Sequence, residues 1–266
     1  MTDTDLHLFD TDIDIIQTKP HEFELDLSDR WSINNTPNGG YMMAMIGKAM
    51  LAFSDKKATP IITANYIARS SSGKASICLE LISKTGTLTR VMARLIQNGK
   101  ERIRALGTFT AEKNENTPPE YDGGPPQIAA FESAIQVPVM RQNSLFNQVD
   151  LRLDPSCTNW VFGGSSYPME FKGWIGFKEN RKMDIPSILL FADSFPPPVF
   201  VAYGAKAWVP TIELSVNIRK VPDVRVLMGR FKSRFISSGL VEEDGELWDE
   251  TGDLVAISRQ YSLYKK

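Results

Sequence analysis

Apolar and polar residues alternate from Glu22 to Arg30, so that Phe23, Leu25 and Leu27 share one face and acidic residues occupy the other. This period of two predicts a half-buried β-strand. Further strand-like runs follow at 60–69, 74–84, 88–97 and 101–111. The sequence Q-N-G-K between the last two runs predicts a hairpin turn. The first part of the chain is therefore predicted to be mostly antiparallel sheet.

A single long helix is predicted within this series of strands. Residues Met42 to Phe53 form an unbroken apolar stretch that contains one lysine and no helix breaker after Gly47. The turn-rich sequence N-N-T-P-N-G-G-Y at 34–41 comes directly before it. A helix that is apolar on all sides is expected to be buried on most of them.

The second part of the chain predicts the same succession of elements. Strand-like runs at 146–153 and 173–178 come before a helix that starts after Asp184 and ends at the triple proline 196–198. Asp184 can cap the helix N-terminus, and Pro186 suits its first turn. Strands are predicted after this helix at about 210–219, 225–237, 239–248 and 254–264.

The two parts are related by an internal repeat. The sequence P-I-I-T-A-N-Y-I-A-R at 60–69 corresponds to P-T-I-E-L-S-V-N-I-R at 210–219, with proline first and arginine last in both. The polar, proline-rich segment 112–145 connects them. We therefore predict two tandem hotdog repeats, 1–111 and 146–266, each with one long helix wrapped by an antiparallel β-sheet. This arrangement is an α+β double-hotdog fold.

The composition excludes several classes of protein. A hydrophobic fraction of 42% and a net charge of -2 are typical of a globular protein and provide no drive toward nucleic acid. No apolar run approaches the roughly 20 residues that span a bilayer, and the N-terminus is acidic where a signal peptide is basic. The two cysteines, Cys78 and Cys157, make neither a disulfide framework nor a metal site. We expect a cytoplasmic protein with no membrane span, no metal and no cofactor.

Four stretches, in this order, carry a resemblance to a known family: W-S-I-N-N-T-P-N-G-G-Y, F-A-D-S-F-P-P-P, V-P-T-I-E-L-S-V-N and L-W-D-E-T-G-D-L-V-A-I-S-R-Q. In this combination the chain resembles the thioesterase II type of double-hotdog acyl-CoA thioesterases over nearly its whole length. The resemblance implies hydrolysis of an acyl-CoA substrate in lipid metabolism. It also implies that Asp193, Thr211 and Gln260 hold the attacking water, because they match the Asp, Thr and Gln of the family.

The residues themselves support part of this assignment. Asp193 is the only carboxylate in the apolar run from Ile185 to Phe195, and an unpaired buried carboxylate is costly enough to need a reason. The alternative is that Asp193 faces solvent in the last helical turn. Taken alone, Thr211 and Gln260 are ordinary strand residues.

The glycine pair before the first helix offers a second functional element. Gly39 and Gly40 leave backbone N–H groups unobstructed at the positive end of the helix, where they can hold an oxyanion or a carbonyl oxygen. The alternative is a plain turn that requires glycine for its backbone angles. Asn38 and Tyr41 flank the pair and are predicted to touch the substrate, although Asn38 also suits the turn itself.

The two repeats differ in the polar residues and glycines of their helices. Residues 40–54 contain no Asp or Glu, whereas the second helix has Asp193 but no Gly-Gly entry. We therefore expect one functional site, with donors from the first repeat and a water-activating carboxylate from the second.

Other functions are weighed against hydrolysis by an activated water. A serine hydrolase and a hotdog dehydratase both need a histidine at the site, but the histidines, His7 and His21, precede the first helix, and no G-x-S-x-G motif occurs. A hotdog module that binds acyl-CoA or acyl carriers without turnover stays open, because fold alone does not specify function. The exposed edges of the two sheets also predict a homodimer.

Overall fold

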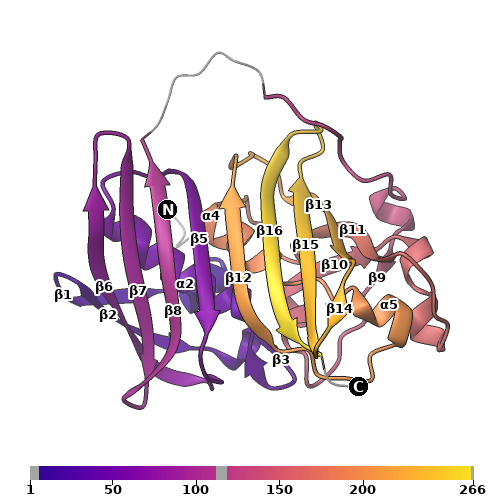
Figure 1. Cartoon of the computed structure of the whole chain (residues 1–266), viewed down its shortest axis with the longest axis horizontal. Coiled ribbons are helices and arrows are strands. Elements are labelled where there is room, and N and C mark those ends of the chain that lie inside the picture. The colour runs from indigo at the N-terminus through magenta and orange to yellow at the C-terminus, as the bar shows by residue number, and fades with distance from the viewer. Residues whose placement is uncertain (1–5, 112–118, 265–266) are drawn as a thin grey trace.

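The computed structural model describes residues 6–111 and 119–264, and all strands within them except the separate pair β3–β4 form one continuous antiparallel sheet (Figure 1). The first repeat contributes one side of this sheet. Its strands run, in spatial order, β1 (Ile15–Lys19), β2 (Glu22–Leu27), β6 (Gly73–Lys84), β7 (Leu88–Gln97), β8 (Lys100–Thr110) and β5 (Ala58–Tyr66).

The second repeat continues the sheet in the reverse order of elements. Its strands run β12 (Thr211–Ile218), β16 (Leu254–Leu263), β15 (Leu240–Trp248), β13 (Val226–Ser233), β11 (Met169–Phe177), β10 (Val149–Leu153) and β9 (Ile135–Gln136), while β14 (Ile236–Ser237) pairs with β15. In both repeats the strand that follows the helix lies at the centre of the whole sheet, so the two repeats are related by a local two-fold arrangement.

The seam between the repeats is the pairing of β5 with β12. These are the two strands that carry the internal sequence repeat, and Ala64 of one pairs with Leu214 of the other. The two residues also occupy the same place in the repeat, four positions after Pro60 and Pro210. The two strands therefore meet as equivalents, and the edge that each repeat offers there is used within the chain.

Two helices pack behind the sheet. Helix α2 (Gly39–Phe53) is capped by Asn38, whose side chain accepts a hydrogen bond from Tyr41 N at 3.0 Å. Helix α4 (Ile185–Phe191) begins with a capping box between Asp184 and Ser187, which satisfies backbone donors of its first turn. Close helix packing requires small residues, and a Cβ on Gly47 of α2 would lie 2.5 Å from Leu189 Cδ1 of α4.

The remaining described elements are short. They are α1 (Leu8–Asp12), η1 (Asp29–Trp31), β3 (Ser32–Ile33), β4 (Thr36–Pro37), η2 (Phe131–Ser133), α3 (Leu145–Gln148), η3 (Pro155–Cys157), η4 (Asn159–Phe162) and α5 (Val199–Tyr203). No helix in the described parts of the chain combines the length and apolar character that a bilayer span requires.

Most predicted elements lie within a few residues of the observed ones. The strand predicted at 173–178 begins earlier, at Met169, and the run 225–237 is divided into β13 and β14. Three further differences concern the two helices and α3. The first helix begins at Gly39 rather than Met42, because Asn38 provides its cap. The second helix ends at Phe191, where Asp193 N and Ser194 N donate to the carbonyl groups three residues earlier and tighten the chain into a turn. Helix α3 takes the start of the strand predicted at 146–153.

The predicted connecting segment 112–145 is not wholly irregular. Residues 112–118 lie outside the described residues, and the remainder contains η2 and the short strand β9, which pairs with β10 at one edge of the sheet. The boundaries of the two repeats stay a prediction.

Candidate active site

The carboxylate of Asp193, from the second repeat, lies at the N-terminus of α2, from the first. Gly40 N donates to Asp193 Oδ2 at 2.9 Å. Asn38 Nδ2 donates to the same oxygen at 3.0 Å and to the Asp193 backbone oxygen at 2.8 Å. The turn that ends α4 places the half-buried Asp193 here, so the alternative of a solvent-facing residue in the last helical turn is wrong.

The glycine pair is explained by this close approach. A Cβ on Gly39 would lie 2.8 Å from Asp193 Oδ2 and 3.0 Å from the Tyr66 ring, whose hydroxyl donates to Gly39 O at 2.9 Å. A Cβ on Gly40 would lie 2.7 Å from Leu190 O and 2.9 Å from Asp193 Cβ. Neither glycine has a positive φ angle. The pair therefore provides room for the second repeat, and the alternative of a turn that needs glycine for its backbone angles is wrong.

Burial raises the pKa of Asp193 from 3.8 to about 6. The Gly40 N–H, the Asn38 amide, the Gln260 amide and the Gly39 N–H oppose this rise, because each favours the ionised form. The positive end of the α2 dipole acts in the same direction. The result is a carboxylate that is mostly ionised at pH 7 and able to accept a proton, which is the property of a general base.

Thr211 and Gln260 lie beside this carboxylate. Gln260 Nε2 donates to Thr211 Oγ1 across the adjacent strands β16 and β12, and contacts Ser262 Oγ at 3.4 Å. The Gln260 amide also interacts with the Asp193 carboxyl group. The structure therefore brings together the three residues of the predicted water site, which are far apart in the sequence.

These groups line a cavity of about 1300 Å³ that both repeats enclose. Its wall includes Asp193, Thr211 and Gln260. It also includes many apolar side chains, among them Met42, Trp160, Phe195, Phe200 and Trp208. A large apolar cavity with a few convergent polar groups is typical of a small-molecule site. It can accept an apolar chain beside a reacting polar group.

The prediction that Tyr41 touches the substrate is wrong. Its side chain is fully buried and its hydroxyl donates to Asp12 O at 2.7 Å and accepts from Ser28 N at 3.1 Å. Tyr41 does not line the cavity, because the first turn of α2 directs it toward Trp31 on the other side of the helix. Burial also raises its pKa, so the hydroxyl stays neutral.

Asn38 does line the cavity, but its polar atoms are already engaged. Its amide nitrogen holds Asp193, and its oxygen caps α2 by accepting from Tyr41 N. The structure thus places Asn38 in contact with Asp193, where it orients the carboxylate.

A residue that the sequence interpretation missed is Glu243 on β15. It lines the cavity and pairs in register with Gln260. Burial raises its pKa well above the usual range, and the nearby charge of Asp193 adds to this rise. The signal was present in the alternation of β15, which puts Glu243 on the same face as Val241, Gly245 and Leu247. An acid among core-facing positions of a strand needs a reason.

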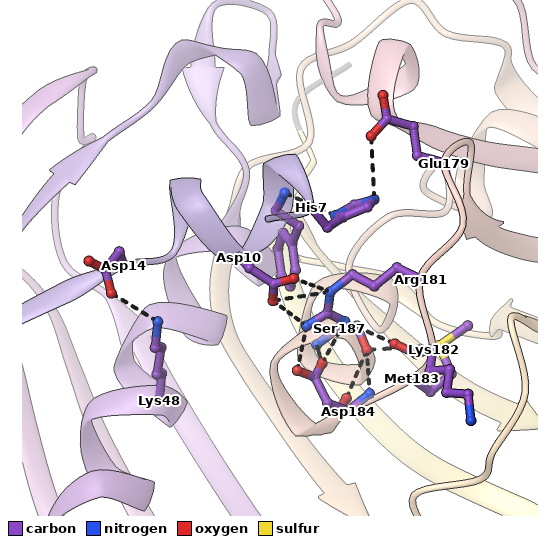
Figure 2. A network of polar contacts seen from close by, with 11 residues as sticks. His7, Asp10, Asp14, Lys48, Glu179, Arg181, Lys182, Met183, Asp184 and Ser187 are labelled. Atoms are coloured by element: carbon purple, nitrogen blue, oxygen red, sulfur yellow. Dashed lines mark hydrogen bonds and ion pairs between the residues drawn. The ribbon is translucent and has the colours of Figure 1, made fainter. Parts of the chain in front are cut away.

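The N-terminus of α4 is the counterpart of the α2 end, and it carries different groups. Asp184 accepts from Ser187 N at 2.9 Å, and Arg181 Nη1 donates to Asp184 Oδ1 at 3.0 Å. Arg181 Nη2 also donates to Asp10 Oδ1 at 2.7 Å, so the guanidinium lies between two carboxylates (Figure 2). Its centre is 5.1 Å from the Phe9 ring of α1. At this helix end the carboxylate of Asp184 is therefore paired with a cation, and α1 packs over that cation.

Sequence profiles of two domains match most of the chain. The profile of the acyl-CoA thioesterase N-terminal domain matches residues 27–110, and that of the acyl-CoA thioesterase C-terminal domain matches residues 117–264. No curated protein matches the sequence.

Solved structures share the fold. A candidate thioesterase II from Thermobifida fusca superposes with a TM-score of 0.91 at 23% identity, over 99% of each chain. The tesB protein of Mycobacterium avium subsp. paratuberculosis superposes with a TM-score of 0.80 at 13% identity, over 97% of this chain and 98% of that one. An acyl-CoA thioesterase II from Mycobacterium marinum gives a TM-score of 0.77 at 13% identity, over 97% of each chain. The predicted α+β double-hotdog fold is confirmed.

Proposed function

The chain belongs to the acyl-CoA thioesterase family and is a thioester hydrolase, and on this premise we propose that Asp193, Thr211 and Gln260 hold the water that cleaves an acyl-CoA. The observation that carries the proposal is the position of the Asp193 carboxylate, which lies on the N-terminus of α2 and beside the Gln260–Thr211 pair. The base Asp193, the two side chains that would hold the water, Thr211 and Gln260, and the N-terminus of α2 thus lie together in one largely apolar cavity.

In the proposed reaction, Asp193 accepts a proton from the water as the oxygen attacks the thioester carbonyl carbon. Thr211 and Gln260 hold that water with the Thr211 hydroxyl, which accepts a hydrogen bond from Gln260, and with the Gln260 amide, which interacts with Asp193. No covalent enzyme intermediate is needed, because water itself is the nucleophile.

The N-terminus of α2 stabilises the charge throughout this step. Before attack, the negative charge lies on Asp193, where Gly40 N donates to it. After attack, the charge is on the former carbonyl oxygen, while Asp193 is neutral. Since Gly39 and Gly40 lie at the same positive helix end, their N–H groups favour the oxyanion as they favoured the carboxylate.

The acyl group is proposed to occupy the apolar part of the cavity. Met42, Phe195 and Phe200 are part of the wall that would contact it. Burial of each methylene contributes about 0.8 kcal/mol, so the acyl chain supplies binding energy that does not depend on the reacting groups. A homodimer, a cytoplasmic location and a role in lipid metabolism stay predictions.

The test is a thiol-release assay with acyl-CoA substrates that carry short, medium, long and aromatic acyl groups. We expect release of CoA from at least one class by the wild-type protein, and titration calorimetry should show that Asp193→Asn still binds that substrate. Release equal to that in buffer for every acyl group would instead support a module that binds acyl-CoA without turnover.

A further inference from the structure

A second carboxyl group, that of Glu243, faces the same cavity as Asp193 and takes no part in the proposed activation of water. Glu243 lies on β15 directly opposite Gln260 on β16, and Gln260 donates to Thr211 on the next strand, β12. Side chains directly opposite on antiparallel strands have Cβ atoms about 5 Å apart. Thr211, Gln260 and Glu243 thus form a row across three adjacent strands, with Asp193 facing it from the turn after α4.

The surroundings of Glu243 differ from those of every neighbouring acid on β15. Asp244 is paired with Arg259 and Arg234, and Glu246 with Arg230. Glu242 accepts hydrogen bonds from two backbone N–H groups of the turn that follows β13. Within the described residues, Glu243 has neither a hydrogen-bond donor nor a cation, and the charged groups that act on it are Asp193, Asp244 and Glu242.

We infer that Glu243 is the general acid of the hydrolysis and delivers a proton to the departing sulfur. The inference rests on the proposed function. It completes an acid–base pair in which Asp193, surrounded by N–H donors, carries the charge, and Glu243, surrounded by carboxylates and an apolar wall, carries the proton. Two carboxyl groups whose surroundings favour opposite protonation states are the usual basis for such a division of roles.

The proton balance is complete without a further reactant. Water loses one proton to Asp193 and forms a C–O bond to the carbonyl carbon. The C–S bond then breaks, and the sulfur takes the proton of Glu243 and leaves as the thiol. The free acid is released, Asp193 is left protonated and Glu243 ionised, and one proton passes through solvent from the first to the second to restore the starting state.

The two carboxyl groups also have the expected order of titration. The pKa of Asp193 is about 6, whereas burial and the Asp193 charge raise the pKa of Glu243 well above its usual range. The surroundings of Glu243 thus favour its protonated form, whereas the N–H donors around Asp193 favour its ionised form.

The decisive experiment compares two thioesters of one acyl group in the wild-type protein and in Glu243→Gln. One is the acyl-CoA, whose alkyl thiolate is basic and gains from protonation as it leaves. The other is the 4-nitrothiophenyl thioester, whose thiolate is weakly basic and leaves without a proton. We expect Glu243→Gln to lower kcat/KM for the acyl-CoA by about 100-fold, a typical contribution of general acid catalysis, and to leave the aryl thioester nearly unchanged.

Glu246→Gln is the matched control, because it makes the same change on the same strand but at a residue that pairs with Arg230 and does not line the cavity. It should leave the ratio between the two substrates unchanged. A pH profile of the wild-type protein adds a test that needs no variant. Activity toward the acyl-CoA should fall at high pH as Glu243 loses its proton, and activity toward the aryl thioester should not.

Equal losses on both substrates in Glu243→Gln would overturn the inference and assign Glu243 a structural or oxyanion-binding role. No loss on either would remove Glu243 from the reaction. Failure of the wild-type protein to cleave either thioester would count against the proposed function itself. This outcome is distinguishable from a failure of the Glu243 inference, because it is seen without any variant.

Discussion

The N-termini of α2 and α4 occupy equivalent places in the two repeats. Each has a carboxylate beside it, but only the carboxylate at α4 is paired with a cation. At α2 the cap is the neutral Asn38, the first turn has no acid, and the carboxylate of Asp193 arrives from the other repeat. At α4 the cap is Asp184, and Arg181 joins it to Asp10 (Figure 2). One end is left with a carboxylate that can take up a proton, whereas the other is held by ion pairs.

The sequence positions explain how this difference arises. Asp193 is nine residues after the cap Asp184, and the residue nine positions after Asn38 is Gly47. Gly47 has no side chain to offer, and it packs against Leu189 instead. Counted from its cap, the first helix therefore offers no carboxylate to the N-terminus of α4, which is held by Asp184, Arg181 and Asp10 instead.

The largest expected effect comes from removing the carboxylate on the α2 side. Asp193→Asn should lower kcat by about 10²-fold or more, because the water loses its base. Asp184→Asn is the matched control on the α4 side and retains a good helix cap, so its kcat should stay close to that of the wild-type protein. The measurement is thiol release under saturating acyl-CoA, and equal losses in both variants would remove the distinction between the two ends.

The next effect tests why glycine begins α2. Gly40→Ala introduces a Cβ against the backbone oxygen of Leu190 and against Asp193, and neither can move without displacing the carboxylate. We expect a loss of about 1–3 kcal/mol in the free energy of unfolding together with a clear fall in kcat. Gly47→Ala meets only the end of the Leu189 side chain, which can rotate.

Chemical denaturation and thiol release on the same preparations would separate these two glycines. The proposal requires that Gly47→Ala keep a larger share of its kcat than Gly40→Ala does. The reverse order would mean that helix packing, and not the approach of Asp193, sets the requirement for glycine.

On the α4 side, Arg181→Gln should lower the free energy of unfolding and leave kcat unchanged. It leaves Asp10 and Asp184 without their shared cation, and we expect the free energy of unfolding to fall by about 1–3 kcal/mol. This is below the cost for a fully buried pair, because the side chains of Asp10 and Asp184 are 35% and 39% exposed. Urea denaturation measures the loss, and a changed kcat in the folded variant would contradict the separation of the two ends.

The smallest expected effect is on the pH dependence of the reaction. Activity of the wild-type protein should fall as the pH decreases through about 6, because Asp193 becomes protonated there. Asn38→Ser keeps a side chain that can cap α2 but removes the amide that donates to the Asp193 carboxylate. Loss of a donor to the charged form raises the pKa, so the acidic limb should move up by about one pH unit.

A pH–rate profile of both proteins checks this shift. An acidic limb at the same pH in Asn38→Ser would show that the hydrogen bond from Asn38 does not hold the carboxylate in its ionised form. The same limb should be absent from the residual activity of Asp193→Asn, since that side chain does not titrate.

Local patterns in the sequence were enough to predict most elements of the fold. The alternation in Glu22–Leu27 is a strand, and the cap at Asp184 starts a helix at the next residue. The predicted end of that helix was wrong, because the tight turn at Asp193 and Ser194 depends on where α2 lies. Tyr41 was misplaced for a related reason, since only the packed structure shows which side of α2 faces the cavity.

The sequence by itself determined most of the strands, the starts of the two helices, their duplication and the identity of the polar residues, because these follow from periodicity, caps and motifs within short stretches. Tertiary structure alone decided that Asp193 meets Gly40 and that its carboxylate faces the row of Gln260 and Glu243. The physical reason is the β5–β12 seam, which pairs residues about 150 positions apart and sets the second repeat against the first helix. Contacts at such a distance along the chain depend on the packing of whole elements and leave no periodic signal near either residue.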